Sequence, residues 1–190
     1  KGKSQLKIRT EDVSFVIDEL KIIFEKDKRF SQVADFDNIG IFGHSFGGCT
    51  SIMSAYNDTR IDAVLGLDTY FLPLPKEIIK KDLNTPFVHL GQVSWGDSDN
   101  YEVMSELGKS SNREFYHFAI EGSKHNDYTD FSQFTKLTRK FGSGKISPKS
   151  IRYIMNDVML GFFDYHLKNK SIFDYNQYQK EYEGVKTYVH

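Results

Sequence analysis

The sequence is poor in cysteine and has no surplus of charge of either sign. Cys49 is the one cysteine among 190 residues, which excludes an internal disulfide and any zinc site built from several cysteines. The 25 basic residues face 26 acidic ones, and the formal net charge of −1 argues against nucleic-acid binding. No apolar run approaches the ~20 residues of a transmembrane helix. A composition with 39% hydrophobic and 27% charged residues instead fits one globular domain over residues 1–190.

Apolar runs and helical periodicity alternate along the chain, up to a polar, tyrosine-rich tail that begins at about residue 169. Because strands that alternate with helices form parallel sheets covered on both faces, the pattern predicts an α/β fold with three layers. Four strands are few for such a sheet, so we expect the C-terminal part of a larger one. The predicted elements are a helix capped by Thr10 and running to Phe24, a strand at 38–42, a helix to about Tyr56, strands at 63–67, 86–90 and 115–120, a helical stretch at 102–107, and a last helix that starts with Ser147 and Pro148.

A glycine-rich turn at 43–48 carries the clearest chemical signal. Gly43-His44-Ser45-Phe46-Gly47 matches G-x-S-x-G, with an apolar strand before it and a helix of small residues after it. In this context the motif places a nucleophile, Ser45, on a strained strand-to-helix turn. We expect the glycines at 43 and 47 to prevent clashes with the turn and with the neighbouring strand. The backbone N–H of Phe46 is then expected to donate to the oxyanion.

A serine nucleophile needs a base, and His125 is the best placed of the six histidines. It lies in a polar loop after the strand at 115–120, and catalytic groups of open parallel sheets gather beyond the carboxyl ends of strands. Serine before histidine is also the chain order of α/β-hydrolases. The remaining histidines are His44 in the turn itself, where we expect it to point away from the serine, His89 and His117 in strands, His166 in the last helix and His190 at the end of the chain.

The acid that orients the histidine has two sets of candidates. Asp68 ends the strand at 63–67, and a carboxylate after an apolar strand requires a partner. Asp97 and Asp99 follow the strand at 86–90, where many α/β-hydrolases carry the acid. Position alone leaves both sets open.

The residues that follow Asp68 are aromatic and apolar. Tyr70, Phe71 and Leu72 are candidates to line an acyl pocket or to rest on a lipid surface, and packing in the core is the alternative. His44, next to Ser45, is a further candidate for the substrate pocket. The candidate pocket residues therefore come from the position just before Ser45 and from the segment just after Asp68.

Several segments carry a joint resemblance that spans most of residues 10–168. They are Gly43-His44-Ser45-Phe46-Gly47-Gly48, Arg60, Leu67-Asp68, Pro86-Phe87-Val88, His125-Asn126-Asp127-Tyr128-Thr129-Asp130-Phe131 and Gly144-Lys145-Ile146. Together they resemble the lipase-like platelet-activating factor acetylhydrolases of the α/β-hydrolase superfamily. The resemblance implies that Asp68, rather than Asp97 or Asp99, is the acid. It also implies cleavage of a short or oxidised acyl chain from the middle position of a glycerophospholipid, without a metal or a cofactor.

Two features depart from the pattern of that family. The family usually has a tryptophan soon after the acid, whereas this chain reads Asp68-Thr69-Tyr70-Phe71-Leu72-Pro73, so an aromatic ring is kept and its identity changes. The first strands of the family, and the loop that supplies the second oxyanion donor, would lie before residue 1. The chain opens on Lys1-Gly2-Lys3-Ser4, without methionine or an apolar signal core, which predicts no particular compartment. We therefore expect a C-terminal piece of a longer protein.

The sequence as a whole predicts a serine esterase that works through Ser45, His125, Asp68 and an acyl-enzyme. The expected substrate is the short or oxidised sn-2 acyl ester of platelet-activating factor-like phospholipids, with peripheral contact to a lipid surface. No nucleic acid, transmembrane segment, cofactor or metal is expected. The alternatives are a general short-chain carboxylesterase of the same fold, and a catalytically silent fragment or binding module that lacks the first half of the sheet.

Overall fold

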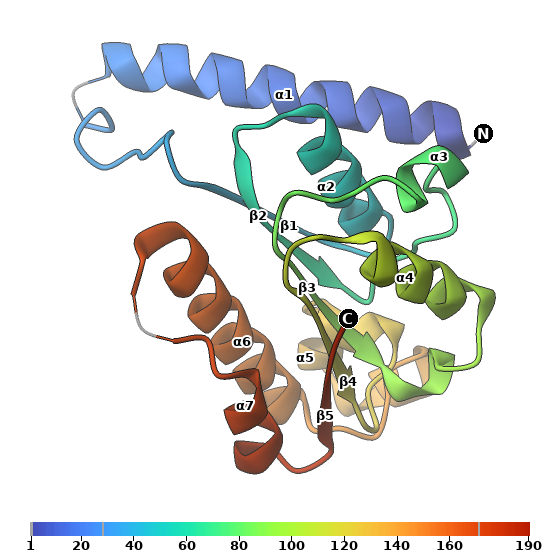
Figure 1. The fold of residues 1–190 in the computed structure, drawn as a ribbon. Helices are drawn as coiled ribbons and strands as arrows, with labels where there is room; N and C mark the ends of the chain where they lie inside the picture. Colours follow the sequence, from blue (N-terminus) through green and yellow to red (C-terminus); the bar gives the residue numbers. More distant parts are fainter. Residues whose placement is uncertain (1, 28, 171) are drawn as a thin grey trace.

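The computed structural model describes residues 2–27, 29–170 and 172–190, and it places one sheet between two layers of helices (Figure 1). The strands follow one another across the sheet in the order β1-β2-β3-β4-β5. Strands β1 to β4 run parallel, and β5 pairs antiparallel with β4. The predicted α/β fold with a mostly parallel sheet is therefore confirmed. The strands are β1 (Ile39–His44), β2 (Ile61–Leu67), β3 (Phe87–Gln92), β4 (Phe115–Ile120) and β5 (Val185–Val189).

The central strands are continuously apolar because both of their faces are covered. Strands β2, β3 and β4 are buried along almost their whole lengths, whereas β1 has part-buried and exposed residues in alternation. Neighbouring residues of β2 belong to different cores, Val64 to one face of the sheet and Leu65 to the other. Runs of apolar residues without alternation are the sequence signal of such strands.

The helices divide between the two faces of the sheet (Figure 1). One face is covered by α1 (Gly2–Lys26), α2 (Phe46–Asn57), α3 (Lys76–Ile79) and α4 (Asp99–Ser110), and the other by α6 (Pro148–Lys168) and α7 (Tyr175–Glu181). Cys49 of α2 is fully buried in the first core. Burial raises the pKa of its thiol to about 12, so Cys49 is a packing residue and no nucleophile at neutral pH.

The last long helix follows its sequence signals closely. The Ser147 hydroxyl accepts a hydrogen bond from the Ser150 N–H at 3.0 Å, and Pro148 is the first residue of α6. The helix buries four residues against the second core, namely Ile151, Ile154, Val158 and Phe162. Its N-terminus is fixed next to the segment that carries His125, because α6 packs against 125–128.

Two predictions about the ends of the chain were wrong. The first helix begins at Gly2 and not after Thr10, whose hydroxyl lies inside the helix and bonds to the Leu6 carbonyl at 2.8 Å. Threonine can make this bond within a helix, so its capping signal is ambiguous. The sheet has five strands among the described residues rather than the predicted four, because the polar tail beyond residue 169 contains β5 as well as α7. A five-residue strand at the edge of a sheet is defined by pairing with a distant strand, which no local period records.

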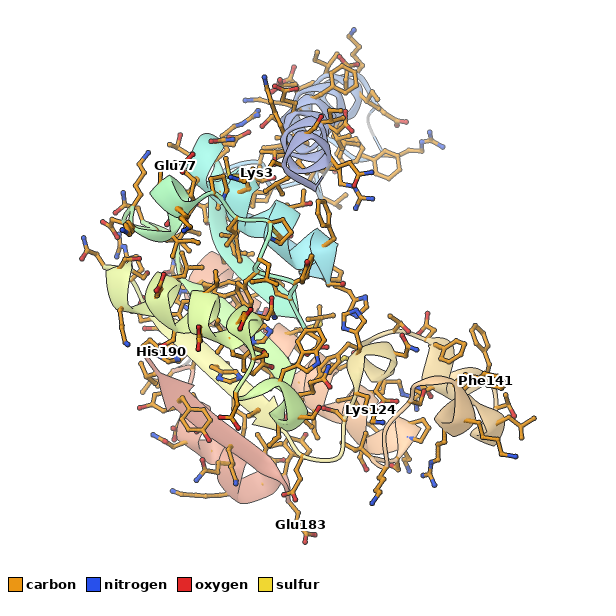
Figure 2. All side chains as sticks on the ribbon, turned by 90° about the vertical axis from the view of Figure 1, so that its right-hand side faces the viewer. Lys3, Glu77, Lys124, Phe141, Glu183 and His190 are labelled. Carbon is orange, nitrogen blue, oxygen red and sulfur yellow. The ribbon has the colours of Figure 1, made fainter. Side chains whose placement is uncertain are left out.

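The segment between β4 and α6 consists of short helical turns: η2 (His125–Tyr128), α5 (Phe131–Phe134) and η3 (Lys136–Phe141). In Figure 2 this segment stands out from the body of the molecule, with Lys124 at its base and Phe141 at its far side. None of the helices among the described residues, the 25-residue α1 included, has the length and hydrophobicity needed to cross a membrane.

Candidate active site

Ser45 lies on a tight turn between β1 and α2, with φ 58° and ψ −119°. A residue other than glycine rarely adopts such angles, so the fold must impose them. Two hydrogen bonds do so: the Ser45 N–H donates to the Leu67 carbonyl at 2.9 Å, and the Ser45 carbonyl accepts from the Tyr70 N–H at 3.0 Å. The turn is therefore tied to the end of β2 and to the residues just after it.

The glycines around this turn differ in their roles. A Cβ at Gly43 would collide with the backbone of Gly47, so the turn requires glycine at 43. The prediction that a side chain at Gly47 would clash was wrong, since a Cβ there would meet nothing within 4 Å. The second crowded position is Gly48, where a Cβ would collide with the Thr69 side chain. Close approach of α2 to the residues after β2 depends on this second glycine.

Asp68 follows β2 directly and is fully buried. Its φ of 40° lies in the left-handed region, and its N–H donates to the Leu90 carbonyl at 2.7 Å. The carboxylate oxygen Oδ2 accepts a hydrogen bond from Nδ1 of His125 at 2.6 Å. Asp97 and Asp99 are exposed, and among the described residues neither makes a hydrogen bond to His125. The structure therefore brings Asp68, out of the three candidate acids, to the histidine.

His125 begins the 3-10 turn η2, and its ring lies between two other rings. The His44 ring has its centroid 4.4 Å away on one side, and the Trp95 ring is nearly parallel at 5.4 Å on the other. The Nε2–H of His44 donates to the backbone carbonyl of His125 at 3.0 Å. Burial lowers the pKa of His44, and the nearby His125 lowers it further, so His44 is neutral near pH 7. His44 thus holds the loop that carries His125.

Ser45 and His125 belong to the same site, because His44 precedes the serine and its ring lies against the His125 ring. The hydrogen bonds of the described residues include none between the Ser45 hydroxyl and the His125 ring. Catalytic hydrogen bonds are commonly long or poorly aligned without substrate. With Nδ1 engaged by Asp68, Nε2 is the nitrogen left to serve as a base.

Phe46 is the first residue of α2, where backbone N–H groups have no partner within the helix. Such a group can donate to the oxyanion that forms on a substrate carbonyl when the Ser45 hydroxyl attacks it, as the motif predicts. The guanidinium of Arg9 lies over the Phe46 ring, 5.0 Å from its centroid. A contact from α1 therefore covers the residue that would supply this donor.

The predicted pocket residues separate into exposed and buried ones. Tyr70 and Leu72 are 39% and 44% exposed and line, with Trp95 and Asn100, a shallow cavity of about 380 Å³. Phe71 is fully buried against the Phe87 and His89 rings, so its prediction as a pocket or surface residue was wrong. Tyr70, Phe71 and Leu72 are consecutive, and the chain after Asp68 points the Phe71 side chain into the core while the other two stay exposed.

A larger cavity, of about 730 Å³, lies elsewhere. Its lining includes Asp62, Pro86 and Glu114, which lie at the amino ends of the parallel strands, together with His166. The candidate triad lies at the opposite, carboxyl ends. The shallow cavity beside Trp95 adjoins the candidate triad, because Trp95 stacks on His125.

The remaining histidines lie away from the candidate triad. His89 is fully buried in β3, where its Nε2 accepts a hydrogen bond from the Thr69 N–H at 3.1 Å. Burial lowers the pKa of His117 in β4 to about 3. His166 lines the far cavity, and His190 packs against Phe115.

Sequence reasoning missed the contribution of the segment after β3. The Gln92 side-chain amide donates to Asp68 Oδ2 at 2.6 Å, and Trp95 stacks on the His125 ring. A neutral amide carries no charge pattern and belongs to no motif, so only its place at the end of a strand could have marked Gln92. Trp95, the single tryptophan, was visible but had no predicted partner.

The order of these elements is that of the α/β-hydrolase fold: the Ser45 turn follows one parallel strand, Asp68 follows the next, and His125 follows a later one. A solved ferulic acid esterase from Streptomyces cinnamoneus shares the fold, with a TM-score of 0.73, 23% identity, and coverage of 90% of this chain and 51% of that one.

The family can be stated more closely. The model of the family described as platelet-activating factor acetylhydrolase, isoform II, matches residues 8–189, and the chain belongs to this family. Platelet-activating factor acetylhydrolase of Gallus gallus is 28% identical over 143 residues, and that of Canis lupus familiaris is 26% identical over 176 residues. These alignments cover 74% and 91% of this chain, but 34% and 36% of the relatives. The chain thus spans about a third of their length.

Proposed function

We propose that the chain carries the catalytic residues of a serine ester hydrolase, with Ser45 as nucleophile, His125 as base and Asp68 as the acid that orients it. The observation that carries this proposal is the 2.6 Å hydrogen bond between the buried Asp68 carboxylate and Nδ1 of His125. It lies at the carboxyl ends of the strands, beside the strained serine turn. Membership in the acetylhydrolase family supports the same assignment.

The proposed reaction is acyl transfer in two halves. His125 Nε2 takes the Ser45 proton as Oγ attacks the ester carbonyl, and the Phe46 N–H donates to the developing oxyanion. His125 then protonates the leaving alcohol, which leaves an acyl-enzyme. Water, deprotonated by the same imidazole, then attacks the acyl-enzyme, which releases the acyl group as a carboxylic acid and restores Ser45. Asp68 stabilises the imidazolium in both halves, since a buried carboxylate interacts strongly with a charge in contact with it.

For the substrate we propose the short or oxidised sn-2 acyl ester of platelet-activating factor-like phospholipids. The family and the apolar rings of Tyr70 and Trp95 beside the histidine support a short acyl group. A general short-chain carboxylesterase is the second candidate, favoured by the shallow form of that cavity. Hydrolysis of a phospholipid with an acetyl sn-2 chain, measured against p-nitrophenyl acetate, separates the two.

An activated serine can be detected directly by a fluorophosphonate probe, which reacts with a serine only when a base assists it. We expect labelling of the unaltered chain, loss of the label in Ser45→Ala, and a strong reduction in His125→Gln. Heat-denatured chain is the control, because unfolding separates the triad while every serine stays present. An unlabelled native chain would favour the catalytically silent binding module.

We further propose peripheral contact with lipid surfaces through the turns that follow His125. Phe134, Leu137 and Phe141 are 77%, 58% and 69% exposed, and Arg139 and Lys140 are their neighbours in sequence. Figure 2 places Phe141 at the far side of this protruding segment. Exposed aromatic residues beside basic ones are typical of surfaces that bind anionic bilayers.

The double variant Phe134→Ser, Phe141→Ser is expected to lower partition onto phosphatidylcholine–phosphatidylserine vesicles by at least about tenfold. The reason is that burial of each phenyl ring in the interface is worth roughly 1.5–3 kcal/mol. Co-sedimentation with the vesicles measures this. Leu160→Ser is the matched control, since Leu160 is 59% exposed on α6, away from these turns. Equal partition of both variants would contradict the proposed contact.

A further inference from the structure

The buried carboxylate of Asp68 has a second partner besides His125. Its Oδ2 accepts a hydrogen bond from Nε2 of Gln92 at 2.6 Å, the same distance as the bond from His125. Its Oδ1 accepts from the backbone N–H of Gln92 at 3.2 Å. Gln92 is the last residue of β3 and is 3% exposed. Two of the three hydrogen bonds on the carboxylate therefore come from one neutral residue.

The orientation of the Gln92 amide follows from its partners. A carboxylate can only accept, so the amide atom against Asp68 must be the nitrogen. The amide oxygen Oε1 accepts from the Ser94 hydroxyl at 2.5 Å, and the Gln92 backbone carbonyl accepts from the Tyr101 hydroxyl at 3.1 Å. Ser94, Gln92, Asp68 and His125 thus form one continuous chain of hydrogen bonds, in which the Asp68 carboxylate fixes the orientation of the amide and the Ser94 hydroxyl holds the amide oxygen.

We propose that Gln92, whose amide oxygen is held by Ser94, is a positioning residue that withdraws charge from the Asp68 oxygen facing His125 and so sets the pH at which the imidazole becomes a free base. The inference rests on the proposed function, in which His125 is that base. The Gln92 N–H and the His125 N–H compete for one oxygen. A carboxylate that already accepts a strong hydrogen bond attracts an imidazolium less than a carboxylate that accepts none.

Three ionisable side chains near this pair, those of His44, Tyr101 and Tyr128, are neutral in the relevant range. His44 of β1 is neutral near pH 7, because burial and the nearby His125 lower its pKa. Burial raises the pKa of Tyr101 of α4 and of Tyr128 of η2 far above their usual range, with the Asp68 charge as the second cause. Asp68 is therefore the acidic side chain in hydrogen-bond contact with the His125 ring among the described residues.

The same short segment supplies three supports to the site. Gln92 ends β3, Ser94 and Trp95 lie in the 3-10 turn η1 (Val93–Trp95), and the Trp95 ring covers one side of His125. This is the strand end where many α/β-hydrolases carry the acid. Here it carries neutral groups that hold the acid of the neighbouring strand, whereas Asp97 and Asp99 are exposed.

The test measures the protonation midpoint of His125 from the ¹⁵N resonances of its ring, which requires no turnover. Gln92→Met removes the amide donor and keeps the size of the side chain. We expect the midpoint to rise by roughly half to one pH unit, a threefold to tenfold change in proton affinity, and the acid limb of kcat/KM to move equally. Ser94→Ala, which removes the donor to the amide oxygen of Gln92, should give a smaller rise. His125→Gln assigns the resonances.

Ser98→Ala is the matched control. Its hydroxyl lies in the same connection and bonds to the Trp95 carbonyl at 2.6 Å, with no link to Asp68, so the midpoint should stay unchanged. An unchanged midpoint in Gln92→Met would overturn the proposal, and if that variant fails to fold by circular dichroism, an unchanged midpoint in Ser94→Ala would do so. The proposed function fails separately, by absence of fluorophosphonate labelling in the unaltered chain.

Discussion

The Ser45→Ala variant is expected to lose kcat for a short p-nitrophenyl ester by roughly 10⁴–10⁶-fold, because no other group of the site can form the acyl-enzyme. Water attack assisted by the oxyanion donor would leave a small residual rate. The measurement is kcat and KM of purified variant and unaltered chain in parallel. Rates within about tenfold of each other would remove the serine from the mechanism.

This variant should fold like the unaltered chain. The strained angles of Ser45 are imposed by backbone hydrogen bonds to Leu67 and Tyr70, which alanine keeps. Ser51→Ala is a matched control, since it removes a hydroxyl of the same helix that bonds to the Gly47 carbonyl at 3.0 Å. We expect its activity to stay within about twofold of the unaltered chain, and thermal unfolding of both variants to stay close to that of the unaltered chain.

Local patterns predicted the parts of the molecule that local physics determines. The serine turn needs a strand, a glycine at 43 and a helix of small residues, and all three are contiguous in the sequence. The loop of His125 was predicted because polar residues follow a buried strand. By position alone the acid stayed undecided between Asp68 and the later aspartates, and the family resemblance selected Asp68, which the structure places on His125.

The parts that could not be predicted depend on contacts between distant segments. Strand β5 exists through pairing with β4, for example Thr187 with Phe118, and has only Val185 as a buried residue. Phe71 was a candidate for the pocket or a lipid surface, with core packing as the alternative. The alternative applies, because the Phe71 N–H donates to the Asn100 side chain of α4 at 2.7 Å and the Phe71 side chain is fully buried. Such partners lie 29 residues or more away along the chain.

The Asp68→Asn variant is expected to lower kcat by about 10³–10⁴-fold with little change in KM, the second largest effect in the site. An asparagine amide can present its nitrogen to Nδ1 of His125, which would favour the wrong tautomer and leave Nε2 protonated. It also leaves the imidazolium of both half-reactions without a buried counter-charge. Steady-state kinetics with the same ester measure the loss.

Asparagine is the right replacement because Asp68 has a φ of 40°, a conformation that asparagine tolerates better than alanine does. Because the asparagine amide N–H meets the donors of Gln92, the melting temperature is expected to fall, and kcat is therefore compared at a temperature at which circular dichroism shows both chains folded. Asp97→Asn is the control of equal chemistry at an exposed position after β3, with an expected rate within about twofold of the unaltered chain. If Asp97→Asn or Asp99→Asn lost more activity than Asp68→Asn, the acid would belong to the later pair, and the 2.6 Å contact with His125 would be structural only.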